Sequence, residues 1–220
     1  MELIHSIWEP AGDEFHPTII ALHGWGANAL DLQGLAPYLA DGKFLTICPQ
    51  GPIEVPIGAL KGYGWFPISM GSPPTMEEIE AGVARCEKFI DEAFDRYPID
   101  RRKTVILGFS QGGVMAFRIA FRNPERFAAV VGLSTWLPKE LLPKLDADKL
   151  AQIQIFMGHG RADDMIEIAR ARQSLELLRD LKVPVVYHEY DCGHEITADE
   201  LQDITKFLTD KVLNPIIQLG

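Results

Sequence analysis

A serine between closely spaced glycines lies near the middle of the chain. The stretch VILGFSQGGVM covers residues 105–115 and places the serine in the spacing Gly108-x-Ser110-x-Gly112. An ordinary tight turn uses the same residue types. A nucleophilic serine on a strained turn between a strand and a helix also needs them, because side chains two residues to either side would collide. The amide dipoles at the start of such a helix suit a developing negative charge.

A serine hydroxyl is a good nucleophile only when a base removes its proton. Among the six histidines, His194 in DCGHEI follows the last strong strand and precedes the final helix. That position puts it on a loop at the same edge of the sheet as the serine. His188 falls inside the strand, His5 and His16 come too early, and His159 belongs to the loop before it. We therefore expect His194 to be the base.

The acid that would orient this base should follow the preceding strand. The run IQIFM leads into GHGRADDMI, which offers Asp163 and Asp164. Aspartates after a strand are commonly turn or cap residues, and spacing alone leaves the two open. We prefer Asp163 as the acid that holds the imidazole in the correct tautomer, with Asp164 as a cap or surface charge.

Two backbone amides are predicted to bind the oxyanion that such a reaction forms. The strand TIIALH ends in His23-Gly24-Trp25-Gly26, where glycines let the backbone approach a substrate oxygen. We expect the amides of Trp25 and Gln111 to be the two donors. A plain glycine turn with Trp25 as a packing aromatic is the other interpretation, and both can hold.

The elements that must position these residues alternate between strand and helix. Strands are expected at residues 18–23, 44–48, 104–108, 127–133, 153–157 and 183–190, with a further edge strand near residues 2–8. Helices are expected at residues 32–40, 76–96, 111–121, 166–181 and 197–213. Strands such as TVILG are apolar throughout, which is typical of a parallel sheet covered by helices on both faces. The predicted fold class is therefore α/β.

One domain over residues 1–220 is the expected organisation, because α/β folds of this length are usually undivided. The longest irregular stretch, residues 49–75, is rich in glycine and proline. Loops that long are usually functional or mobile. No insertion is large enough for a separate lid domain, so we expect an open site.

The charge balance limits the partners. Asp and Glu outnumber Lys and Arg by 31 to 21, giving a formal net charge of −10. Such a surface repels phosphate backbones, so we expect no nucleic-acid partner. No apolar run reaches the length of a membrane span, and the start MELIHSIWEP lacks the features of a signal peptide. We expect no stable membrane insertion.

The cysteines indicate a reducing compartment. Cys48, Cys86 and Cys192 are few and scattered, which favours a cytoplasmic protein without a disulfide framework. CxxC and HExxH spacings are absent, so the sequence predicts no metal and no other cofactor.

Several motifs together resemble one family. LHGWG, GFSQGG, LSTWLP, the HG-x-x-D loop and the late GHEI are similar, in order and over nearly the whole chain, to the phospholipase/carboxylesterase family of α/β-hydrolases. That family includes acyl-protein thioesterases and lysophospholipases. The resemblance implies a Ser110, Asp163 and His194 triad with Trp25 and Gln111 as backbone donors. It also implies hydrolysis of an acyl ester or thioester through an acyl-serine intermediate, and it leaves a homodimer open.

Two departures from the family pattern concern the acid loop. Members usually carry HGDxDxxV, whereas this chain reads HGRADDMI, with Arg161 in place of the first aspartate and Asp164 where a proline is common. The resemblance further implies an acyl groove formed by residues 49–70 and LSTWLP. The wall residues expected there are Ile53, Trp65, Met70 and Trp136.

Two other functions use the same fold. A dienelactone-hydrolase-like enzyme acting on cyclic esters normally has cysteine at the position of Ser110. A non-catalytic hydrolase-fold protein that binds a ligand tends to lose a member of the triad, and every position is filled here. Neither the acyl-chain length nor the natural leaving group follows from the sequence.

Overall fold

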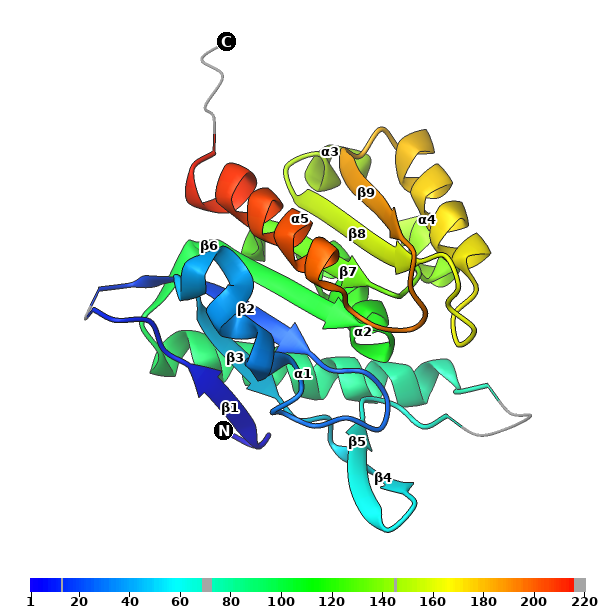
Figure 1. Ribbon diagram of the computed structural model, residues 1–220, viewed down its shortest axis with the longest axis horizontal. Helices are drawn as coiled ribbons and strands as arrows, with labels where there is room; N and C mark the ends of the chain where they lie inside the picture. Colours follow the sequence, from blue (N-terminus) through cyan, green and yellow to red (C-terminus); the bar gives the residue numbers. More distant parts are fainter. Residues whose placement is uncertain (13, 69–72, 145, 216–220) are drawn as a thin grey trace.

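The computed structural model describes residues 1–12, 14–68, 73–144 and 146–215. Within these residues a seven-stranded sheet runs in the order β1-β3-β2-β6-β7-β8-β9 (Figure 1). Its strands are β1 (His5–Trp8), β2 (His16–Leu22), β3 (Leu45–Pro49), β6 (Ile99–Phe109), β7 (Ala129–Leu133), β8 (Gln154–Gly160) and β9 (Val185–Tyr190). Only the edge strand β1 is antiparallel to its neighbour in this sheet, and the other pairs are parallel.

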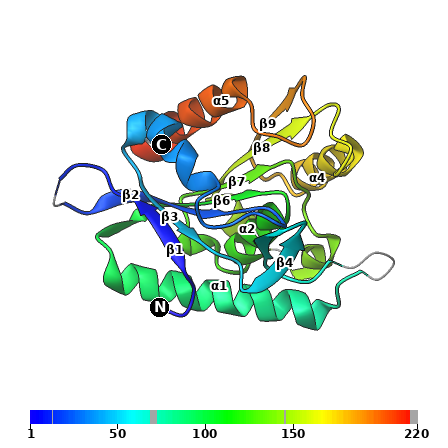
Figure 2. The same ribbon diagram turned by 60° about the horizontal axis from the view of Figure 1, so that its bottom comes forward.

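Helices cover both faces of the sheet. They are α1 (Met76–Arg96), α2 (Gln111–Arg122), α3 (Ala147–Leu150), α4 (Ile168–Asp180) and α5 (Ala198–Leu208), with 3₁₀ segments η1 (Leu32–Gly42), η2 (Pro124–Arg126) and η3 (Lys139–Lys144) and a π-helical turn η4 (Thr209–Leu213). In Figure 2, α1 lies below the sheet and η1 and α5 lie above it. The predicted α/β class, a mostly parallel sheet between helices, is confirmed. None of the described helices combines the length and hydropathy needed to cross a membrane.

Alternating side chains of each central strand join two separate apolar clusters. In β2, Ile20 packs with the cluster that contains α1 and α2, and Ile19 packs with the cluster that contains η1 and α5. In β6, Ile106 and Val105 divide in the same way, and all four side chains are fully buried. Burial on both faces is why residues 19–22 of β2 and 105–108 of β6 carry no polar side chain, whereas the more exposed residues 100–103 of β6 are charged.

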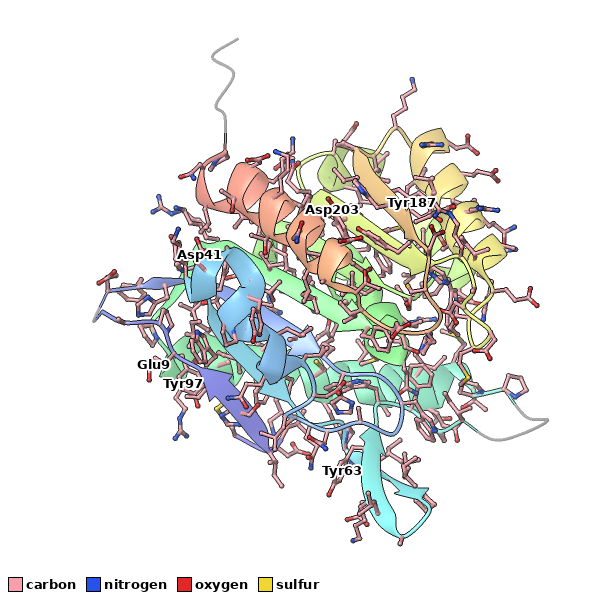
Figure 3. All side chains as sticks on the ribbon, in the orientation of Figure 1. Glu9, Asp41, Tyr63, Tyr97, Tyr187 and Asp203 are labelled. Carbon is pink, nitrogen blue, oxygen red and sulfur yellow. The ribbon has the colours of Figure 1, made fainter. Side chains whose placement is uncertain are left out.

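Part of residues 49–75 forms regular structure, contrary to the expectation from the sequence. Strands β4 (Ile53–Ile57) and β5 (Leu60–Gly64) pair as an antiparallel hairpin, at the bottom of Figure 1. Backbone hydrogen bonds of Tyr63, which is labelled in Figure 3, join the hairpin to the loop after β2. Tyr63 N donates to Ala27 O at 2.7 Å, and Gly26 N donates to Tyr63 O at 2.8 Å. Among the described residues there is no large lid domain.

Candidate active site

Ser110 occupies a strained turn between the end of β6 and the start of α2. Its backbone angles are φ 53° and ψ −117°, a combination that residues other than glycine rarely adopt. A Cβ atom on Gly108 would meet the carbonyl group of Gly112, and one on Gly112 would meet the carbonyl oxygen of Leu22. Both glycines are therefore required by close backbone contacts, as the spacing predicts.

Hydrogen bonds to both backbone groups of Ser110 hold this turn in place. Ser110 N donates to Leu133 O at 2.9 Å, and Ser110 O accepts from Gly113 N at 3.0 Å. The Thr135 hydroxyl donates to the same carbonyl oxygen at 2.9 Å. Because Leu133 and Thr135 flank the end of β7, the neighbouring strand stabilises the unfavourable backbone of the serine.

His194 and Asp163 are joined at the same edge of the sheet. His194 Nδ1 donates to Asp163 Oδ2 at 2.8 Å. A carboxylate only accepts, so this bond places the ring proton on Nδ1 and leaves Nε2 free to accept another. Asp163 Oδ1 accepts from the amides of Met165 at 3.0 Å and Ile166 at 2.8 Å, and the side chain is completely buried. Asp164 is exposed.

The His194 ring lies against the turn that carries the serine. Its centroid is 4.8 Å from that of Phe109, the residue before Ser110. Among the described residues no hydrogen bond joins the Ser110 hydroxyl to His194. In enzymes without substrate such bonds are often long and shorten when the substrate binds. The sequence-predicted serine, histidine and Asp163 thus come from the ends of three strands to one edge of the sheet.

The two amides expected to bind an oxyanion lie beside the serine. The loop after β2 passes so close that a Cβ atom on Gly24 would be 3.4 Å from Ser110 Cβ. Gln111 is the first residue of α2, so its amide has no acceptor within the helix. Across the described part of the chain, neither the Trp25 nor the Gln111 amide donates a hydrogen bond to the protein. Both are available to an oxygen bound at the turn.

The side chain of Gln111 has a role that the sequence did not indicate. It is 3% exposed, its Oε1 accepts from Trp65 N at 2.8 Å, and its Nε2 donates to Phe66 O at 2.7 Å. These bonds fix the segment after the β4–β5 hairpin against the start of α2. The partners are about 45 positions away in the chain, so no local pattern reveals them.

We call residues 23–26, in the loop after β2, the oxyanion loop. His23 joins this loop to Gly51, which comes just before the β4–β5 hairpin. Its Nε2 accepts from Gly51 N at 2.9 Å, and its Nδ1 donates to Gly24 O at 2.7 Å. Burial lowers the pKa of His23, which keeps the ring neutral as an accepting Nε2 requires. Its carbonyl oxygen accepts from the indole of Trp65 at 2.8 Å.

His159 stabilises the loop that carries the acid. Its Nε2 donates to Ile166 O at 2.7 Å and lies 3.4 Å from Asp163 Oδ2. Burial lowers the pKa of His159, so it is a neutral neighbour of the carboxylate and not a counter-ion. Arg161 is one of the two departures from the family pattern, and its guanidinium forms an ion pair with Asp191 at 2.5 Å.

The predicted wall residues differ in their surroundings. Ile53 and Trp136 are partly exposed, as a groove wall requires. Trp65 is fully buried, with its ring centroid 5.2 Å from that of His23, so its assignment to the wall is wrong. Its indole N–H donates to the carbonyl oxygen of His23, so the buried ring leaves no polar group unpaired. Met70 lies outside the described residues.

A second histidine–aspartate pair lies elsewhere. His188 Nδ1 is 2.9 Å from Asp203 Oδ2, and Tyr190 donates to the same carboxylate at 2.9 Å. Asp203 is labelled on α5 in Figure 3, so this pair joins β9 to α5. No group of three or more His, Cys, Asp or Glu side chains that could hold a metal ion occurs in the part of the chain that the structure describes.

Sequence comparison identifies relatives along nearly the whole chain. The model of the phospholipase/carboxylesterase family matches residues 4–212. Acyl-protein thioesterase 1 of Debaryomyces hansenii is 30% identical over 209 residues, covering 87% of this chain and 90% of that protein. Acyl-protein thioesterase 1 of Gibberella zeae is also 30% identical, covering 90% of this chain and 92% of that protein.

Solved structures share the fold. The crystal structure of esterase PE8 superimposes with a TM-score of 0.83 at 23% identity, covering 96% of this chain and all of that one. Acyl-protein thioesterase 2 of Zea mays gives a TM-score of 0.76 at 24% identity, covering 94% of this chain and 98% of that one. At these identities the structures establish the architecture.

Proposed function

This chain belongs to the phospholipase/carboxylesterase family of α/β-hydrolases, and on that premise we propose that Ser110, His194 and Asp163 form its catalytic triad. As a member of that family the protein is a carboxylic-ester hydrolase. The observation that carries the proposal is the 2.8 Å bond from His194 Nδ1 to the buried Asp163, beside a serine with positive φ. We further propose an acyl-serine intermediate.

In the first half-reaction His194 Nε2 takes the proton of Ser110 while the serine oxygen attacks the carbonyl carbon of the substrate. The carbonyl oxygen becomes an oxyanion and accepts hydrogen bonds from the amides of Trp25 and Gln111. Asp163 stabilises the imidazolium that forms. The bond from carbon to the leaving oxygen or sulfur then breaks, and His194 gives its proton to the leaving group.

In the second half-reaction water replaces the serine hydroxyl. His194 Nε2 takes a proton from water, the oxygen of that water attacks the acyl carbon, and the same two amides bind the oxyanion. The ester bond to Ser110 breaks, and His194 returns the proton to the serine oxygen. The products are a carboxylic acid and the free enzyme, so the proposed reaction requires no cofactor.

Thioesters are proposed as substrates beside oxygen esters. The support is the name of the relatives at 30% identity, which are acyl-protein thioesterases. Lysophospholipids remain a prediction from the family resemblance.

The test measures hydrolysis of p-nitrophenyl esters from acetate to palmitate, together with one acyl thioester. The parent protein should turn over several of these substrates. Ser110→Ala should lower kcat by a factor on the order of 10⁴ or more while the melting temperature shows that the fold persists. Near-parent turnover in Ser110→Ala would refute the assignment. No turnover of any substrate by the parent would favour a ligand-binding protein with this fold.

A further inference from the structure

A cavity of about 280 Å³ lies next to the proposed base, and we name it the His194 cavity. It is formed by the start of η1, the end of β6 and the loop between β9 and α5. The lining residues are Asp31, Leu32, Leu35, Phe109, His194, Glu195 and Ile196. Nothing in the mechanism above uses the two carboxylates among them.

The lining combines an apolar surface with uncompensated negative charge. Leu32, Leu35 and Ile196 supply the apolar part. Asp31 and Glu195 are exposed, and neither carboxylate forms an ion pair or a hydrogen bond with any other described residue. Three other carboxylates, those of Asp163, Asp203 and Glu189, are each paired.

The cavity lies beside the residue that protonates the leaving group in the proposed reaction. His194 forms part of its wall, and so does Phe109, whose ring is in contact with His194. In the proposed reaction His194 hands its proton to the departing oxygen or sulfur, so that atom must pass beside this ring. At ~30 Å³ per water molecule, the cavity has room for roughly nine waters. That space suits a small head group better than a long acyl chain.

We propose that the His194 cavity binds a leaving group that carries a positively charged nitrogen. The preferred substrates are then esters or thioesters whose alcohol or thiol bears an ammonium group a few bonds from the scissile atom. Asp31 and Glu195 attract the charge, the apolar wall receives alkyl groups on the nitrogen, and the aromatic ring of Phe109 in the lining also favours a cation. This inference rests on the proposed function, because it concerns the group that His194 protonates.

The test compares two esters of equal shape, butyrylcholine and 3,3-dimethylbutyl butyrate, in which carbon replaces the charged nitrogen. We expect kcat/KM to be about three- to tenfold higher for butyrylcholine at low salt, since each exposed ion pair is weak. The preference should shrink as salt screens the carboxylates. Asp31→Asn and Glu195→Gln should each lower the ratio, and the double variant should bring it close to one.

Asp180→Asn is the matched control, because it removes the same charge from the exposed end of α4 and should leave the ratio unchanged. A second test uses the parent protein alone. Choline should inhibit it more strongly than 3,3-dimethylbutanol, in which carbon replaces the charged nitrogen. A ratio near one in the parent, or a preference that survives in the double variant, overturns the inference while hydrolysis of the neutral ester upholds the proposed function. Failure to hydrolyse either ester, or any ester of the panel, would count against the proposed function itself.

Discussion

Asp163 and Asp164 are neighbours in the chain with opposite surroundings. Asp163 is buried and accepts hydrogen bonds from His194 and two backbone amides, whereas Asp164 is exposed. The structure therefore gives different surroundings to two residues between which spacing alone could not choose. Burial and hydrogen bonding depend on how the loop after β8 turns, and a run of two aspartates does not encode that turn.

We predict that Asp163→Asn lowers kcat by a factor on the order of 10³–10⁴. An asparagine amide can donate to Nδ1 of His194, which favours the tautomer with the proton on Nε2 and removes the base. Steady-state hydrolysis of p-nitrophenyl butyrate measures the effect. Asp164→Asn is the matched control and should stay within about twofold of the parent, as expected for an exposed surface substitution. Equal losses in the two variants would show that Asp163 has no special role.

The roles of other residues also divide into those that the sequence reveals and those that only the structure reveals. Gly108 was predictable because the collision that it avoids, with the carbonyl group of Gly112, is local. Gly112 avoids the carbonyl oxygen of Leu22, which is distant in the chain, and was predicted from the spacing of the motif. The burial of Trp65 and the bonds made by the Gln111 side chain were not, because their partners lie more than 40 positions away. Trp65 was expected on a groove wall because the family resemblance implies that residues 49–70 line the groove.

At the scale of elements, the β4–β5 hairpin determines where the oxyanion loop lies. Helix α1 has the predicted bounds, Met76–Arg96, because its apolar periodicity and the Thr75–Glu78 capping box are local signals. The hairpin was missed because the stretch is rich in glycine and proline, which are depleted in strands. Its pairing with Ala27 across 36 positions is a tertiary contact.

Gly62 in β5 provides a test of this contact. A Cβ atom on Gly62 would meet the carbonyl oxygen of Gly26, so Gly62→Ala must push the hairpin and the oxyanion loop apart. We expect kcat/KM for p-nitrophenyl butyrate to fall by at least about tenfold, since a displacement near 1 Å in a catalytic group costs up to about 100-fold.

Gly34→Ala in η1 is the matched control, because a Cβ atom there would enter open space. Its kcat/KM should equal that of the parent. Unchanged activity in Gly62→Ala, with the protein folded, would mean that the hairpin does not position the loop containing the Trp25 amide.

At the scale of the whole molecule, the two apolar clusters are the two faces of one sheet. Strands β2 and β6 contribute to both, so neither cluster can form without the other. The single domain over residues 1–220 stays a prediction that this arrangement favours. A cytoplasmic location likewise stays a prediction from the sequence, and a homodimer is an alternative that the family resemblance leaves open.

Burial raises the pKa of Glu200, at the start of α5, to about 7. Between the ordinary pKa of 4.5 and this value, the folded state holds a proton that the unfolded state releases. Glu200 therefore contributes most stability below pH 4.5 and loses that contribution as pH rises to about 7. We predict that Glu200→Gln, relative to the parent, gains up to about 3 kcal/mol of unfolding free energy between pH 5 and pH 8.

Urea unfolding of parent and variant at the two pH values measures this difference. The variant must be compared with the parent at each pH because other groups also make the stability of the parent depend on pH. Burial lowers the pKa of His23 and His159, which makes the parent less stable in acid. Glu176→Gln on the exposed face of α4 is the control and should show no pH-dependent difference. A constant offset between Glu200→Gln and the parent would contradict the prediction.

The central claim is that Ser110, activated by His194, carries the acyl group. A fluorophosphonate reacts covalently with an activated serine, and peptide mass spectrometry locates the modified residue. We predict stoichiometric labelling at Ser110 in the parent and strongly slowed labelling in His194→Ala. Modification at another residue, or equal labelling rates with and without His194, would contradict the account.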